Sequence, residues 1–289
     1  VFRVQHHFAH AASLMAEHKI TDPIICISCD GFGYGLDGSA WGGEIIYSDP
    51  TNMKRIGHLE PQLMPGGDLC TKYPIRMLTS ILSKILDTTE IESYFLNKNL
   101  INNFKYGQKE LQIILKQLEK RLNLPVTTSC GRILDAISSL LNICHIKTYE
   151  GEPAMRLEAV AKSFNCKNID HDFIEPEIKF NKSIILNTTY LIEQLLDKMA
   201  KGIKKPKLAY IAHYYIGKGL AEIAIEKSRE YETKIVGFTG GVAFNTIITR
   251  IIKKFVEKNN IKFLQHCLVP PGDGGISIGQ AIIVASKIK

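Results

Sequence analysis

The pattern of apolar and polar positions near the N-terminus predicts one helix followed by three strands. In HHFAHAASLMAEHKI, apolar residues recur at three- and four-residue spacing, as on one face of a helix. The run PIICISC is short and apolar, so it predicts a buried strand that ends at the glycine-rich turn DGFGYGLDGS. AWGGEIIYS and MKRIGHLE predict two further strands, and we expect the three strands to form an antiparallel meander. The apolar stripe of the helix consists of Phe8, Ala11, Ala12, Met15 and Ala16.

Helical periodicity dominates the middle of the chain. Leucine and isoleucine recur at helical spacing from 75 to 122, and GRILDAISSLLNI and AMRLEAVAKSF predict two more amphipathic helices. Residues 167–190 are polar and irregular, which predicts a connecting segment. Two helices are then expected in TYLIEQLLDKMAKGI and KLAYIAHYYIGKGLAEIAIEKSREY.

The last part of the chain alternates strand and helix, which is typical of the α/β class. TKIVGFTGG predicts a strand with a glycine turn, and VAFNTIITRIIKKFVEKN predicts the helix after it. IKFLQHCLVP predicts another strand, and GGISIGQAIIVASKI predicts a terminal helix.

Composition and charge narrow the function classes. The 289 residues are 45% hydrophobic and 22% charged, as in ordinary globular proteins. No apolar run approaches the roughly 20 residues of a membrane span, and no signal-peptide pattern opens the chain. We therefore expect no membrane partner. The net charge of +7 comes from lysines mixed with acidic residues, which favours solvated helix faces over a nucleic-acid surface. Because the first residue is Val1 rather than Met, we expect a piece of a longer protein.

The seven cysteines are scattered and odd in number, which indicates a reducing cytoplasm rather than a disulfide framework. Cys26 and Cys29 form a C-x-x-C pair inside the apolar run, but residues three apart on a strand point to opposite faces. This geometry argues against a zinc knuckle or a redox pair. No G-x-S-x-G elbow occurs, and no cysteine has a local basic partner.

Two histidines near the N-terminus have the spacing of metal ligands. His6 and His10 are four residues apart, so on a helix their imidazoles lie on one face and can converge on one ion. They can also be polar residues on a solvated helix. The segment lacks the glutamate of H-E-x-x-H, since His7 follows His6, and this excludes the zinc-protease motif.

Glycine turns and acidic residues supply a second group of candidates. CDGFGYG and TGGVAFN each follow a predicted strand, and such turns let backbone N–H groups approach phosphate or simply close a hairpin. Neither has the spacing of a Walker A loop or a Rossmann fingerprint. Asp30 and Asp273 each fall at the end of a predicted strand, where ligands gather in α/β sheets; turn or cap roles are the alternative.

Taken together, the motifs resemble the C-terminal part of the HypF family, the carbamoyltransferases of [NiFe]-hydrogenase maturation. The resemblance runs in order from residue 4 to the C-terminus. The last domain of the HypF family is related to the tRNA threonylcarbamoyladenosine transferases of the actin-like ATPase superfamily. The motifs are VQHHFAHAASLMAEH, CDGFGYGLDGSAWGGEII, LMPGGD, GRILDAISSLL, YEGEPAMRLE, GGVAFN and PPGDGGISIGQA.

The resemblance implies an α/β, ribonuclease-H-like second lobe of the actin-like type, with most of the first lobe outside this chain. Residues 1–23 would be the histidine helix that ends the first lobe, and residues 24–289 the second lobe. Large helical insertions are expected at about 75–125 and 190–232. The acylphosphatase-like, zinc-finger and YrdC-like domains of the family are not in this sequence.

The resemblance also implies a set of site residues. Metal ligands and catalytic residues would be His6, His10, Asp30 and Asp273, holding iron or zinc, with magnesium as a further candidate. Nucleotide-binding positions would be Asp30, Gly31 and Gly33 for phosphate, Asp135 and Gly151 for the nucleoside, and Gly240, Gly241 and Asn245 for the adenylate. The role of His7, the additional histidine of the HypF pattern, is left open.

The implied activity is transfer of a carbamoyl group from carbamoyl adenylate to the C-terminal cysteine of HypE, for synthesis of cyanide ligands. The YrdC-like domain would make the adenylate from carbamoyl phosphate and ATP. Two alternatives stand beside it: a related transferase acting on tRNA or on another hydroxyl, and a non-catalytic nucleotide-binding module. HHFAH and YEGEPAMRLE favour the HypF family.

Overall fold

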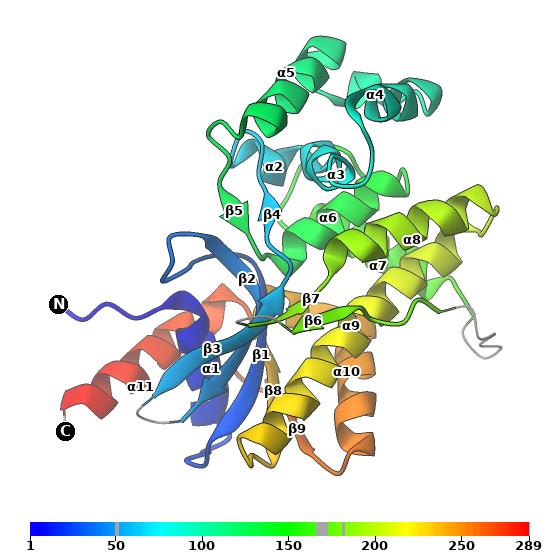
Figure 1. Ribbon diagram of the computed structural model, residues 1–289. Coiled ribbons are helices and arrows are strands. Elements are labelled where there is room, and N and C mark those ends of the chain that lie inside the picture. The colour runs from blue at the N-terminus through cyan, green and yellow to red at the C-terminus, as the bar shows by residue number, and fades with distance from the viewer. Residues whose placement is uncertain (50–51, 166–172, 181–182, 289) are drawn as a thin grey trace.

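The fold is built on one twisted sheet. The computed structural model describes residues 1–49, 52–165, 173–180 and 183–288. The first three long strands form the predicted antiparallel meander (Figure 1). They are β1 (Ile24–Tyr34), β2 (Ala40–Ser48) and β3 (Met53–Leu59).

Two late strands complete the core of the sheet beside β1. β8 (Ile235–Thr239) pairs with β1 in parallel, and β9 (Lys262–Gln265) pairs with β8 in parallel. The order β3-β2-β1-β8-β9, with β2 alone reversed, is the ribonuclease-H-like arrangement that the resemblance implies. The α/β fold class is therefore confirmed.

Short strands extend this core. β7 (Ile184–Leu186) pairs with β3, and β6 (Ile178–Phe180) pairs with β7. β4 (Gln62–Leu63) and β5 (Val126–Thr127) pair with each other beside β2. Both β6 and β7 lie within the segment predicted as an irregular connection, so that prediction is wrong for them; residues 166–172 and 181–182 lie outside the described residues.

Helices cover the two faces of the sheet. α1 (His6–Glu17) and α11 (Ile276–Ile288) pack together on one face, and α9 (Lys205–Glu230) with α10 (Thr246–Lys258) lies on the other (Figure 1). The strand cysteines separate accordingly. Cys26 packs with the apolar residues under α1, whereas Cys29 belongs to the large core on the opposite side. This confirms that the C-x-x-C pair points to opposite faces.

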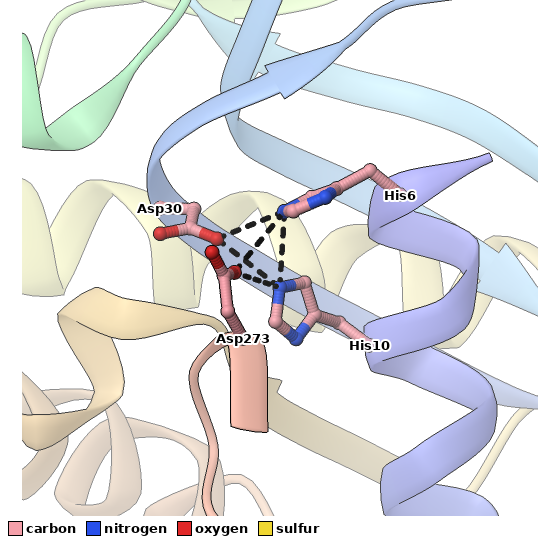
Figure 2. A group of neighbouring side chains, drawn as sticks. All are labelled: His6, His10, Asp30 and Asp273. Carbon is pink, nitrogen blue, oxygen red and sulfur yellow. Dashed lines mark hydrogen bonds and ion pairs between the residues drawn. The ribbon is translucent and has the colours of Figure 1, made fainter. Parts of the chain in front are cut away.

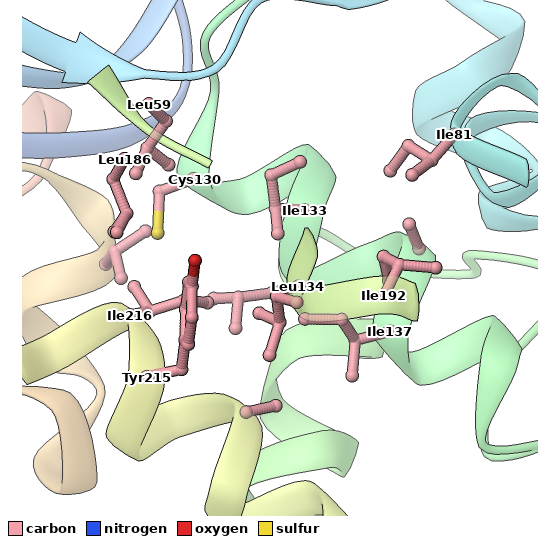
Figure 3. Packing of buried hydrophobic residues seen from close by; sticks show 14 of the residues in the cluster. Leu59, Ile81, Cys130, Ile133, Leu134, Ile137, Leu186, Ile192, Tyr215 and Ile216 are labelled. Carbon is pink, nitrogen blue, oxygen red and sulfur yellow. The ribbon is translucent and has the colours of Figure 1, made fainter. Parts of the chain in front are cut away.

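The remaining helices form a layer beyond α9. Their large shared core includes Ile133, Ile137 and Tyr215 (Figure 3). Among the described residues, none of the helices is both long enough and apolar enough to cross a bilayer. The helices of this layer are α2 (Leu69–Lys72), α3 (Pro74–Leu82), α4 (Thr88–Asn97), α5 (Gly107–Lys120), α6 (Cys130–Leu140), α7 (Glu152–Lys162) and α8 (Thr188–Ala200).

Three local expectations need correction. β1 does not end at the glycine-rich stretch but continues through it to Tyr34, with its register against β2 shifting between Cys29 and Gly33. The helix expected to begin at Val242 begins at Thr246, after a short 3₁₀ turn. Finally, α1 lacks the solvent-exposed polar face that its apolar stripe predicts. It is buried on nearly all sides because α11 covers what the sheet does not.

Candidate metal centre

α1 brings the two histidines together at the edge of the parallel strands. Gln5 caps the helix, because its side-chain oxygen accepts a hydrogen bond from the Phe8 amide at 2.9 Å. His6 and His10 then project one helical turn apart toward the same point, and their Nε2 atoms are 3.2 Å from each other (Figure 2). The His10 side chain is 1% exposed, which excludes a merely solvated role for it.

Asp30 reaches this point from β1. Its Oδ2 lies 3.1 Å from the Nε2 atoms of both His6 and His10, while its Oδ1 accepts the Gly31 amide at 2.7 Å. The shift of register after Cys29 frees this part of β1 from regular pairing, so the carboxylate can turn toward α1.

Asp273 completes the group from the loop after β9. Its Oδ1 is 3.6 Å from Nε2 of His6 and 3.7 Å from Nε2 of His10. These distances exceed a hydrogen bond, and the Asp273 side chain is 75% exposed. Asp30 lies within β1, just past its parallel pairing with β8, and not at the end of the strand as its sequence predicts. Asp273 and the turn after β8 do follow parallel strands, at the edge where ligands bind in α/β sheets.

The spacing and chemistry of these four side chains fit a divalent metal ion. Ligands bound tetrahedrally at the usual metal–nitrogen length are about 3.4 Å apart, close to the distances above. Two imidazole nitrogens with two carboxylate oxygens suit zinc or ferrous iron. His6, His10, Asp30 and Asp273 are therefore the residues that would hold it.

The electrostatics of the group keep Asp30 ionised. Burial would raise the pKa of this carboxyl, but hydrogen bonds from His10, His6 and the Gly31 amide outweigh burial and hold the pKa well below its usual value. The carboxylate is therefore available as a ligand at any physiological pH.

Three of the predicted nucleotide-site glycines lie against these four side chains, each at a close approach. A Cβ on Gly33 would lie 2.3 Å from Cε1 of His7 and 2.6 Å from Cδ2 of His6, so Gly33 makes room for imidazole rings. Gly240 has φ +90°, and its Cβ would meet the Cys29 carbonyl oxygen at 2.2 Å. A Cβ on Gly241 would lie 2.9 Å from Oδ1 of Asp30. The turn after β8 thus lies against the four candidate metal ligands His6, His10, Asp30 and Asp273, called the metal-ligand group below.

His7 is fully buried against Gly33 of β1. Burial lowers the pKa of His7 to about 3, so the ring is neutral. Its Nδ1 lies 3.3 Å from the side-chain nitrogen Nε2 of Gln5. His7 therefore packs beside the ligand group and does not join it.

The N-terminus of α6 adds features that the sequence did not single out. The Ser129 hydroxyl donates to the carbonyl oxygens of Asp30 and Gly31 at 2.9 and 2.7 Å. A Cβ on Gly131 would lie 2.9 Å from Cα of Gly31, and the guanidinium of Arg132 comes close to the same residue. An N-terminus placed here favours an anion. The signal that could have identified Arg132 is its spacing three residues before Asp135, which allows an ion pair on one helix face.

Of the other predicted nucleotide-site residues, Asp135 and Gly151 lie in the outer helical layer, whereas Asn245 lies at the start of α10. Asp135 is buried in α6 and pairs with Arg132 at 2.7 Å; burial raises the pKa of this carboxyl to about 6 against the opposing effect of the guanidinium. Gly151 has φ +74° and begins α7. Asn245 caps α10, since its side-chain oxygen accepts the amides of Ile247 and Ile248. Asp135 thus pairs with a guanidinium that lies near Gly31, the residue after Asp30.

Comparison with known proteins gives a consistent family. The family described as "Carbamoyltransferase, Kae1-like Domain, second subdomain" matches residues 26–280. A "Probable carbamoyltransferase HypF" of Methanocaldococcus jannaschii is 48% identical over 287 residues, which make up 99% of this chain and 36% of that protein. A "Carbamoyltransferase HypF homolog" of Cupriavidus necator is 29% identical and is covered to 71%.

Solved structures agree with this family. The crystal structure of T. kodakarensis HypF has a TM-score of 0.88 at 37% identity, over 99% of this chain and 36% of that one. Full-length HypF in its phosphate- and nucleotide-bound form has a TM-score of 0.85 at 30% identity, with the same coverage. The chain spans about a third of the length of these two proteins and of the M. jannaschii relative. The resemblance is thereby confirmed, and the chain belongs to the family of the Kae1-like domain of HypF carbamoyltransferases, as its second subdomain.

Proposed function

We propose that this chain carries the carbamoyl-transfer site of a HypF-type protein. It would bind carbamoyl adenylate at the metal-ligand group and pass the carbamoyl group to the C-terminal cysteine of HypE, for synthesis of the cyanide ligands of [NiFe]-hydrogenase. The observation that carries the proposal is the convergence of His6, His10, Asp30 and Asp273 beside the Gly240–Gly241 turn.

The surroundings suit an anionic adenylate. The α6 N-terminus and the Arg132 guanidinium lie next to Gly31, and the Gly241 backbone lies next to the Asp30 carboxylate. Both can face phosphate oxygens. A divalent metal held by the four ligands would supply Lewis-acid stabilisation of the negative charge on the leaving phosphate. A structural relative has phosphate and nucleotide bound, which supports this use of the fold.

The transfer step needs no nucleophile from this chain. The thiol of the HypE cysteine loses its proton to solvent, and the resulting thiolate attacks the carbamoyl carbon. A carbon–sulfur bond forms while the carbon–oxygen bond to the adenylate phosphate breaks, and AMP leaves with the electron pair. The chain's own task is to hold the adenylate and orient the carbonyl. Five of the six cysteines that the structure describes are buried, which agrees with an external thiol.

The acceptor is tested by direct competition. The chain is mixed with a separately purified YrdC-like domain, ATP, carbamoyl phosphate and either HypE or tRNA, and the acceptor is analysed by mass spectrometry. We expect a carbamoyl group on the HypE cysteine with wild type and its loss with His10→Ala. Modification of tRNA alone would contradict the proposal, and ATP binding with transfer to neither acceptor would identify a nucleotide-binding module.

The metal site is tested separately by elemental analysis. His6→Ala and His10→Ala are expected to lose the bound zinc or iron that wild type retains, because each removes one of two nitrogen ligands. His18→Ala is the matched control, since His18 lies at the other end of α1 and its side chain bonds to the Gln265 carbonyl at 2.8 Å. Unchanged metal stoichiometry in the first two variants would refute the site.

A further inference from the structure

A hydrogen-bonded chain of three side chains connects the far end of α1 to the strand beside the ligand group. Oε2 of Glu17 lies 2.7 Å from Nδ1 of His266, and Nε2 of His266 lies 3.0 Å from the hydroxyl of Thr239. With Nδ1 donating to the carboxylate, Nε2 is left to accept the Thr239 proton. The order carboxylate, imidazole, hydroxyl is that of a nucleophilic triad.

Burial decides against a nucleophilic role. Thr239 is fully buried, and the side chains of Glu17 and His266 are 5% and 2% exposed. A substrate cannot reach the hydroxyl, so the three groups act on the protein itself.

What they hold is the loop that carries Asp273. The second oxygen of Glu17 accepts the amides of Cys267 and Leu268 at 2.7 and 2.6 Å. Farther along, the Pro271 carbonyl accepts the Gly240 amide at 2.9 Å. The Thr239 hydroxyl lies 3.3 Å from the same carbonyl, but its one proton goes to His266, so Thr239 acts on this loop through His266. The loop is thus fastened at both ends, to α1 and to β8.

Asp273 depends on this fastening because its own side chain is exposed and beyond hydrogen-bond distance of the histidines. The backbone of its loop therefore decides where its carboxylate lies. Glu17, the last residue of α1, accepts hydrogen bonds from that loop. The same helix carries His6 and His10.

We propose that Glu17, His266 and Thr239 are positioning residues that set Asp273 at its distance from His6 and His10. The proposal rests on the metal site of the proposed function. The three residues touch neither substrate nor metal; they make one rigid frame of α1, the end of β8 and the Asp273 loop. Such supporting groups around metal ligands are worth 10- to 100-fold in affinity.

A direct metal role for this region is the competing explanation. Glu17, His18 and Cys267 lie close enough together to share an ion. However, one Glu17 oxygen already accepts two amides and the other accepts His266, while His18 Nε2 faces the Gln265 carbonyl. The amide contacts lower the pKa of Glu17 to about 2 although burial opposes its ionisation, as expected for a carboxylate that serves as an anchor. The hydrogen bonds account for the cluster.

The test is a double-mutant cycle on zinc affinity, measured by competition with a chelating dye on the 289-residue chain. Glu17→Ala removes the acceptor of three hydrogen bonds, and we expect about 10- to 100-fold weaker zinc binding. In an Asp273→Asn background the same substitution should cause no further loss, because Glu17 acts only through Asp273. His18→Ala should bind zinc as wild type does.

Thr239→Val keeps the shape and removes the hydroxyl, and it serves if Glu17→Ala does not fold. We expect it to weaken zinc binding, and Thr239→Ser to restore it. Wild-type affinity in folded Glu17→Ala or Thr239→Val, or an equal loss in the Asp273→Asn background, would overturn the positioning role alone. Failure of wild type to bind zinc would overturn the metal site as well. Loss of transfer to HypE with an intact cycle would overturn only the proposed function.

Discussion

The two carboxylate oxygens of Asp30 have different partners, and this division orients the residue. One oxygen is fixed by the next amide along the chain, at Gly31, which leaves the other pointing at both imidazoles. A side chain held in this way loses little further entropy when it binds an ion. The preorganisation comes from local backbone geometry at the bulge of β1.

Glu17 provides a prediction about pH at the same scale. Its pKa is lowered from 4.5 to about 2 in the folded chain, so the folded state binds its proton more weakly than the unfolded state does. The stability that Glu17 contributes is then complete above pH 4.5 and is lost as the pH falls toward 2. We expect Glu17→Gln to lower the free energy of unfolding more at pH 7 than at pH 3, as measured by urea denaturation. A destabilisation that is equal at both pH values would contradict the assignment.

At the scale of the elements, α1 and α11 approach each other closely at Gly279. A Cβ on Gly279 would lie 1.8 Å from the Ala9 carbonyl oxygen, which is backbone and cannot swing aside. The two helices therefore touch at Ala9, the residue directly before His10. This approach explains why α1 is buried on the side that its sequence pattern leaves polar.

Gly279→Ala tests that contact. An alanine normally stabilises the interior of a helix by about 1 kcal/mol relative to glycine. Here we expect the opposite, a lower melting temperature, because the added methyl forces α11 away from α1 by overpacking worth about 1 to 3 kcal/mol. Ser277→Ala, on the same helix at an exposed position, should leave the melting temperature unchanged or raise it. A stabilised Gly279→Ala would show that the helices are farther apart.

At the scale of the whole molecule, a buried ion pair joins helices within the outer layer. Arg76 of α3 pairs with Glu110 of α5, and both side chains are less than a tenth exposed. Arg76 also donates to the Pro65 carbonyl at 3.0 Å, in the loop that leads from the sheet. This single guanidinium thus connects the outer helices with the segment next to the sheet.

Arg76→Leu should be among the most destabilising substitutions in the layer. It leaves the Glu110 carboxylate buried without its partner, at a cost of about 3 to 5 kcal/mol. Changing both residues to leucine should recover much of that loss, since no buried charge remains. Lys116→Ala, an exposed change on α5, should have little effect. Denaturant unfolding of the four proteins measures this, and a double variant no more stable than Arg76→Leu would contradict the explanation.

Most elements were predictable because their hydrophobic period is local. The meander, the helix of His6 and His10 and the terminal helix all occur where the pattern places them. The extension of β1 to Tyr34 was not predictable, because glycines signal a turn unless a partner strand and packed imidazoles hold them extended. The short strands β6 and β7 depend on pairing with β3, and nothing in their own sequence indicates that partner.

By itself, the sequence determined which residues could act as ligands and, through its motifs, the family to which the chain belongs. Helical spacing alone places His6 and His10 on one face. Only the tertiary structure decided that Asp30 and Asp273 meet them, since this depends on the order of parallel strands and on two loops far apart in the chain. The same holds for the Glu17–His266–Thr239 chain, whose members are ordinary polar residues until folding removes water and leaves each one a single partner.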